Sequence, residues 1–272
     1  MKEIYVRSIT GAVLVSIIVG SIIFSKFSLA AVFLLITILG TYEFYKMLEN
    51  SKYHPQINFG TLISATLYTL LALVAHNIIS PLYLTIVVVL LFIIPIRELY
   101  RTDNDSPIPN ISQTVFGIIY VGLTFGLMNF LFYHGYKGEE TYHFILAFFV
   151  IIWASDSFAY LTGVSIGKHK LFKRISPKKS WEGFFGGFFA ALTVGYIFST
   201  FYNDFSTLSW IGYAAIINIS GVYGDLIQSM FKRSLGLKDS GTILPGHGGI
   251  LDRFDAAFVA LPFAIAYVML IS

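Results

Sequence analysis

The chain has 272 residues, of which 56% are hydrophobic and only 12% are charged, and its formal net charge is +3 at pH 7. With a mean hydropathy of +0.74, this composition excludes a soluble globular domain. It indicates an integral membrane protein instead, because the apolar runs approach the ~20 residues that a helix needs to cross a bilayer. The absence of cysteine excludes disulfides and thiolate metal sites.

The apolar runs predict an all-α polytopic fold with about nine transmembrane helices. The expected spans are residues 5–24, 28–47, 58–76, 80–97, 112–134, 143–166, 183–202, 207–230 and 256–271. No cleavable signal is expected, because only a short turn without a clear small-residue cleavage site separates the first two runs. We expect a single integral-membrane domain over residues 1–272, with amino-terminal helices in 1–141 and the active-site half in 142–272.

The basic residues predict how these helices are oriented. All Lys and Arg residues except Lys26 and Lys137 lie at the amino terminus or near the loops after the second, fourth, sixth and eighth predicted helices. Since cytoplasmic loops are enriched in Lys and Arg, this side is expected to face the cytoplasm. Glu43, near the end of the second predicted helix, is interpreted as interfacial rather than catalytic.

The sixth predicted helix contains the sequence WASDSFAYLTG, which places Asp156 well inside an apolar span. An unpaired carboxylate there costs at least ~2.5 kcal/mol on insertion scales, so Asp156 is expected to face a partner or a wet cavity. By spacing, Asp156, Tyr160 and Gly163 share one face of the helix. A structural ion pair and a role in chemistry both explain this carboxylate.

The loop after the sixth helix, GKHKLFKRISPKKSWEG, is strongly basic. We expect Ser176 to be the N-cap of the next helix, with Pro177 at its first position, so that backbone amides together with Lys178 and Lys179 bind an anion. The alternative is an ordinary basic loop attracted to anionic lipid. Glu182 is expected to pair with this basic group or to bind a metal.

The seventh predicted helix is rich in glycine, with the sequence FFGGFFAALTVGYIF. Small residues let neighbouring helices approach closely in a membrane. We therefore assign Gly183, Gly186, Gly187 and Gly195 to helix packing rather than to chemistry.

The eighth predicted helix carries Asp225, Ser229 and Lys232 at i, i+4 and i+7. This spacing aligns a carboxylate, a hydroxyl and an ammonium group along one face, as expected of residues that line a site.

The loop after the eighth helix contains glycines that permit close backbone approach to a ligand, and a proline that restrains its entry. These residues are Gly241, Gly246, Gly248, Gly249 and Pro245. Asp252 and Asp255 follow at the start of the last helix, and together with Asp225 they are suitable hard oxygen ligands for Mg²⁺. Taken alone, Asp255 is equally explained as a carboxylate interacting with the helix dipole.

The stretch from residue 229 to 255, SMFKRSLGLKDSGTILPGHGGILDRFD, resembles the signature of the phosphatidate cytidylyltransferases. The matching positions are Ser229, Lys232, Arg233, Lys238, Asp239, Pro245, His247, Gly248, Gly249, Asp252, Arg253 and Asp255. The resemblance extends upstream to Asp225 and to the segments SPKKSWEG and DSFAYLTG, whereas the amino-terminal half matches only as a set of apolar helices. It implies an integral-membrane enzyme that joins CTP and phosphatidate to give CDP-diacylglycerol and pyrophosphate.

Two polyanions must meet in this reaction while negative charge grows on the pyrophosphate, which calls for Mg²⁺ and basic side chains. The expected catalytic residues are Asp225, Asp252, Lys232, Arg233, Lys238 and Arg253. The expected metal ligands are Asp225 and Asp252, with Asp255 and Asp156 as additional or indirect ligands. The expected substrate-binding residues are Ser176, Lys178, Lys179, Ser229, His247, Gly248 and Gly249. His247 is expected to form hydrogen bonds rather than act as a general base, because a phosphate whose second pKa is ~6 is already anionic near neutral pH.

Two other functions are compatible with the residues. A CTP-dependent polyprenol or phytol kinase would use similar basic loops but would transfer the γ-phosphate. A non-enzymatic transporter would explain the helices and Asp156 without requiring the observed spacing of carboxylates and glycines. The expected partners are CTP, phosphatidate and membrane lipid, with no nucleic acid. The resemblance further implies a homodimer and a bacterial inner-membrane location, with the active site facing the cytoplasm.

Overall fold

The computed structural model describes residues 2–49, 51–102, 106–133, 141–243 and 248–271. Contacts within the chain divide it into two compact units. The first unit contains Met1–Asn129 and Ser234–Phe254, and the second contains Phe130–Arg233 and Asp255–Ser272. Each unit therefore consists of two separate stretches of sequence, and the first change of unit falls at residue 130.

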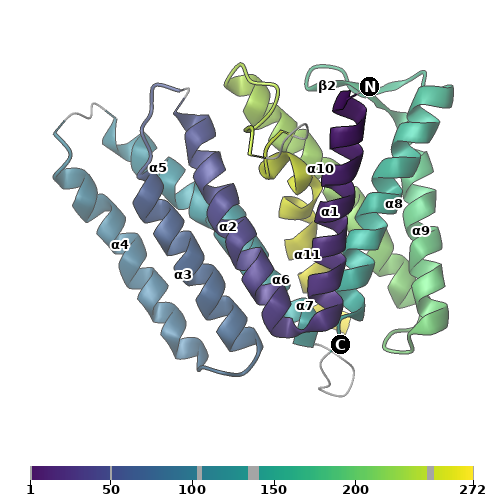
Figure 1. The fold of residues 1–272 in the computed structure, drawn as a ribbon, viewed down its shortest axis with the longest axis horizontal. Helices are drawn as coiled ribbons and strands as arrows, with labels where there is room; N and C mark the ends of the chain where they lie inside the picture. Colours follow the sequence, from purple (N-terminus) through teal and green to yellow (C-terminus); the bar gives the residue numbers. More distant parts are fainter. Residues whose placement is uncertain (1, 50, 103–105, 134–140, 244–247, 272) are drawn as a thin grey trace. The chain divides into compact units, whose positions relative to one another are not determined.

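The first unit is built from helices of about membrane-spanning length (Figure 1). These are α1 (Lys2–Phe24), α2 (Lys26–Leu48), α3 (Ile57–Ala75), η1 (Pro81–Leu84) with α4 (Thr85–Leu99), and α5 (Pro107–Gly117) with the π-helical η2 (Ile118–Leu123) and α6 (Thr124–Met128). A short 3₁₀ turn, η3 (Leu251–Arg253), also belongs to this unit. Helices α2, α3 and α4 lie side by side, in purple to blue in Figure 1.

The second unit combines four longer elements with a small hairpin. Its elements are α7 (Phe130–Tyr133), α8 (His143–Ile166), β1 (Lys170–Phe172), β2 (Ser176–Ser180), α9 (Trp181–Phe201), α10 (Thr207–Ser234) and α11 (Asp255–Ile271). Helices α8 and α9 pack along each other and are joined by the antiparallel hairpin β1–β2, in which Phe172 lies opposite Ser176.

The predicted polytopic helical fold is confirmed. In the described part of the chain, each expected apolar segment is helical, and seven of the helical spans are long and apolar enough to cross a membrane. Two shorter apolar helices, Ile9–Phe24 and Asp255–Ile271, account for the first and last expected segments. The fifth span begins earlier than predicted, at Pro107, because proline is tolerated in the first turn of a helix.

The predicted helix start at Ser176 is wrong. Residues Ser176–Ser180 form β2, and α9 begins at Trp181 with Ser180 as its N-cap, whose hydroxyl accepts a hydrogen bond from the Gly183 amide at 3.1 Å. The extended backbone that Pro177 favours at Ser176 suits an N-cap and a strand alike. Here Ser176–Ser180 pairs with β1, which delays the helix start to Trp181. The backbone amides at the start of this helix are therefore those that follow Ser180, not those that follow Ser176.

The glycines of α9 bring it close to α8, as predicted. A Cβ atom on Gly187 would lie 2.7 Å from the backbone oxygen of Ser155, and one on Gly183 would lie 2.8 Å from that of Ala159. Because the obstructing atoms belong to the backbone, neither helix can accommodate a side chain here without moving. These glycines hold the packing distance between the two helices.

Replacing Gly187 by Ala is expected to destabilise the protein by about 1–3 kcal/mol, because it overpacks this interface. The thermal unfolding midpoint in detergent measures the effect. Gly20→Ala is the matched control, since nothing lies within 4 Å of a Cβ atom placed there. Equal midpoints for the two variants would contradict the packing role of Gly187.

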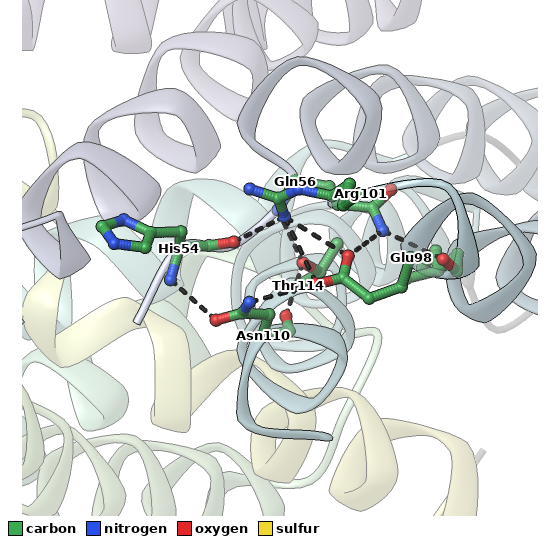
Figure 2. A network of polar contacts seen from close by, with 7 residues as sticks. His54, Gln56, Glu98, Arg101, Asn110 and Thr114 are labelled. Atoms are coloured by element: carbon green, nitrogen blue, oxygen red, sulfur yellow. Dashed lines mark hydrogen bonds and ion pairs between the residues drawn. The ribbon is translucent and has the colours of Figure 1, made fainter. Parts of the chain in front are cut away.

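A polar network with a buried centre and two exposed members, His54 and Arg101, links the start of α3, the end of α4 and α5 in the first unit (Figure 2). Its members are His54, Gln56, Glu98, Arg101, Asn110 and Thr114. The Glu98 carboxylate is only 5% exposed and accepts hydrogen bonds from Gln56 Nε2 at 2.7 Å and Asn110 Nδ2 at 3.0 Å. The network thus links three helices through hydrogen bonds between protein groups.

Candidate active site

Three aspartates from three helices of the second unit form a carboxylate cluster: Asp156 on α8, Asp225 on α10 and Asp255 at the start of α11. They lie close enough for each carboxylate to interact electrostatically with the other two. Gly224 allows the close approach of Asp225 and Asp255, because a Cβ atom there would lie 2.6 Å from the Asp255 backbone oxygen. The glycine lets α10 and α11 meet beside Asp225.

Two lysines and a serine accompany the carboxylate cluster. Lys179, from β2, forms an ion pair with Asp225 in which Nζ lies 2.5 Å from Oδ2. Ser229 donates its hydroxyl to Asp225 Oδ1 at 3.2 Å, as the predicted i, i+4 spacing requires. Lys232, which is buried, attracts Asp255 electrostatically. Segments far apart in the sequence thus place three negative and two positive groups together.

The donor chemistry of the carboxylate cluster fits Mg²⁺. Carboxylate oxygens are the ligands that this ion prefers, and like charges gathered between apolar helices favour a cation among them. As the side chains lie, no group of three or more His, Asp or Glu residues in the described ranges is arranged closely enough to hold a metal ion. In this arrangement Lys179 supplies part of the compensating charge.

Asp252 lies in the first unit, within what we call the signature loop, residues 234–254. Its Oδ2 atom accepts hydrogen bonds from the Ser240 amide at 2.9 Å and the Gly249 amide at 3.1 Å, which closes the loop on itself. Gly248 has a φ of +81°, a left-handed conformation that favours glycine. Asp252 therefore has a structural part in shaping the loop, in addition to its predicted role as a metal ligand.

Glu43 is a residue of this region that the sequence did not identify. It was expected at the membrane interface, but its side chain is only 3% exposed and accepts three hydrogen bonds from the signature loop. The donors are Ser240 Oγ at 2.6 Å, the Ile250 amide at 2.9 Å and the Leu251 amide at 3.0 Å. The Glu43 carboxylate is therefore turned into the protein, where it binds the signature loop. The available signal was a carboxylate in an otherwise apolar helix.

Glu182 pairs with His169 rather than with a lysine or arginine. Its Oε1 atom lies 2.6 Å from His169 Nδ1, and its carboxylate accepts the His169 amide at 3.2 Å. Glu182 was predicted to pair with the basic group that includes Lys178 and Lys179 or to bind a metal, and its observed partner is His169 instead. The contact links the residue before β1 to the first turn of α9.

The other predicted site residues are distributed over both units. The exposed basic residues are Lys178 and Arg233 in the second unit and Lys238 and Arg253 in the first. Ser176 is half-buried in β2, and Gly248 and Gly249 lie in the signature loop. His247 falls outside the described residues, as do Pro245 and Gly246.

The sequence is similar to known cytidylyltransferases. A sequence model of the family described as "Cytidylyltransferase family" matches residues 5–271. The phosphatidate cytidylyltransferase of Staphylococcus aureus (strain COL) is 46% identical over 147 residues, which cover 53% of this chain and 54% of the relative. That of Haemophilus influenzae (strain ATCC 51907 / DSM 11121 / KW20 / Rd) is 44% identical over 133 residues, or 46% of each chain. The chain thus spans about half the length of the curated relatives it matches.

Proposed function

Because the chain belongs to the cytidylyltransferase family, we propose that it transfers the cytidylyl group of CTP to phosphatidate, giving CDP-diacylglycerol and pyrophosphate. The resemblance seen at residues 229 to 255 is confirmed, at the level of the family, by the match over residues 5–271. The observation that carries the proposed activity is the carboxylate cluster with Lys179 among apolar helices. Such a concentration of charge is costly within a membrane protein and is typical of a functional site.

The proposed metal ligands remain Asp225 and Asp252, with Asp156 and Asp255 as further ligands. When bound, Mg²⁺ would offset the charge of the CTP phosphates and of the departing pyrophosphate. The Lys179 ion pair and the Ser229 hydrogen bond both act on Asp225, so they support its role by orienting its carboxylate.

The basic residues would neutralise the two phosphate-bearing substrates. In the proposed reaction an oxygen of the lipid phosphate forms a bond to the α-phosphorus of CTP, while the bond to the pyrophosphate breaks. Lys232, Arg233, Lys238 and Arg253 are assigned to the growing negative charge, and Lys178 to substrate binding. No strong base is needed, because the attacking phosphate is already ionised near neutral pH, its second pKa being ~6. Positioning and charge compensation would therefore supply most of the rate enhancement.

The protein is a multi-pass membrane protein, and we place it in the bacterial inner membrane with its reaction on the cytoplasmic side. The distribution of Lys and Arg supports this orientation. The bacterial origin of the relatives supports the location. A homodimer is part of the proposal on family grounds alone.

The position of an isotopic label tests the reaction directly. Purified protein in phosphatidate-containing liposomes, supplied with Mg²⁺ and α-labelled CTP, is expected to transfer the label to the lipid and to release one pyrophosphate for each lipid labelled. With γ-labelled CTP the lipid should stay unlabelled. Label from the γ position in a lipid alcohol would indicate a CTP-dependent lipid kinase instead. Folded protein that consumes no CTP with any phosphorylated lipid would favour a transporter.

A further inference from the structure

The signature loop is held from two sides by two carboxylates of the first unit. Asp252 accepts the Ser240 and Gly249 amides, whereas Glu43 accepts the Ser240 hydroxyl and the Ile250 and Leu251 amides. Ser240 therefore bonds to both carboxylates, and consecutive amides at 249 and 250 point to different ones. A shift of either carboxylate would disturb the hydrogen bonds of the other.

Two glycines of the loop are required by Glu43 itself. A Cβ atom on Gly249 would collide with Glu43 Oε1, and one on Gly241 would lie 2.8 Å from Glu43 Oε2. The sequence suggested that such glycines admit a ligand. Their nearest neighbour in the fold is instead the buried carboxylate, which explains glycine at both positions without a ligand.

The part of α2 that carries Glu43 is itself firmly anchored. The Tyr45 hydroxyl donates to the backbone oxygen of Thr114 at 2.6 Å, and Thr114 belongs to the polar network of Figure 2. Tyr45 is fully buried, and a Cβ atom on Gly60 or Gly117 would collide with its ring. Glu43 thus projects from a helix end that neighbouring helices hold on several sides.

We propose that Glu43 is a positioning residue for the proposed reaction, which fixes the signature loop and through it Asp252. The carboxylate suits this task, because hydrogen bonds to a charged acceptor are about twice as strong as neutral ones. Its partners are 197 to 208 residues away in the sequence, so it secures the loop to a distant helix. This role rests on the proposed function and adds a residue outside the signature.

The first test separates kcat from KM in the α-label assay. Glu43→Gln replaces one accepting oxygen by an NH₂ group, which cannot accept a hydrogen bond. Because the partners of Glu43 are all N–H or O–H donors, the loop should be displaced. We expect kcat to fall and the KM for CTP to rise, lowering kcat/KM for CTP by about 10²-fold. A mere loss of folded protein would lower the apparent kcat and leave the KM for CTP unchanged.

Two further variants serve as controls. Glu49→Gln removes an exposed carboxylate at the end of the same helix, where it pairs with Lys46, and should leave the kinetics unchanged. Ser240→Ala removes one of the three donors and should have a smaller effect than Glu43→Gln. Because both changes act on one contact, the double variant should be no worse than Glu43→Gln alone.

The second test reads the loop without using activity. The chain has no cysteine, so Thr242→Cys places a single, exposed thiol in the signature loop. Adding Glu43→Gln should change the rate at which a water-soluble maleimide labels this thiol by about tenfold. A single cysteine that replaces the buried Ala264 is the control and should stay protected in both backgrounds.

The outcomes distinguish the two proposals. Unchanged labelling at position 242, or unchanged kinetics of Glu43→Gln in an active enzyme, would overturn the role of Glu43. A folded wild-type protein that is inactive with CTP and phosphatidate would overturn the proposed function, even if the labelling rate showed that Glu43 anchors the loop.

Discussion

Replacing Asp225 by Asn is expected to lower kcat by about 10³-fold or more while the protein stays folded. Asp225 pairs with Lys179, accepts from Ser229, and interacts electrostatically with Asp156 and Asp255. Losing its charge would remove several kcal/mol of transition-state stabilisation if it binds the metal, and each 1.36 kcal/mol is a factor of ten in rate. The measurement is α-label transfer by purified protein at saturating CTP and Mg²⁺.

The matched control is Asp204→Asn. Asp204 is a carboxylate of the same unit that pairs with His143 at 3.0 Å, apart from the carboxylate cluster. This variant should keep near-normal turnover, and gel filtration and thermal unfolding should show both variants to be folded. Normal turnover by Asp225→Asn would remove Asp225 from the proposed metal site.

The second large effect is expected from Asp252→Asn, which should also lose about 10³-fold in kcat. Asparagine keeps a side-chain oxygen that can accept the Ser240 and Gly249 amides, so the loop should stay closed while the charge is lost. The fall in turnover then measures the contribution of the negative charge of Asp252, separately from its hydrogen bonds. Titrating activity with Mg²⁺ shows whether the requirement for the ion has changed.

Comparison with Asp252→Ala separates the two parts played by this residue. Alanine removes the acceptor as well as the charge, so this variant should lower the unfolding midpoint in addition to abolishing turnover. Near-normal turnover of folded Asp252→Asn would exclude a metal role for Asp252 and leave only the closure of the loop.

The helices were predictable because a bilayer demands long apolar runs, and each run is visible in local sequence. The members of the carboxylate cluster could also be identified one by one. Asp156 stood out as a charge inside a span, and Asp225 as part of a polar helix face. The proximity of Asp225 to Asp255 depends on the close packing of α10 and α11 at Gly224, which spacing along a single helix does not reveal.

The errors have specific physical causes. Both Ser176 and Ser180 are residues suited to an N-cap, and the pairing of β2 with β1, which is not visible in the local pattern, places Ser176 in a strand. The contacts of Glu43 could not be predicted, because all three of its donors lie about two hundred residues further along the chain. No local pattern distinguishes a carboxylate with such distant partners from one at the membrane surface.

The alternation of the chain between its two units limits how the protein can be divided. Residues 234–254 belong with the amino-terminal helices, although both α10 and α11, which flank them, contribute to the other unit. A fragment ending at residue 129 would contain Glu43 without the loop that it binds. The complementary fragment would contain the loop without that carboxylate. No single cut therefore yields two complete halves, and split or truncated forms must be designed around this interleaved, discontinuous architecture.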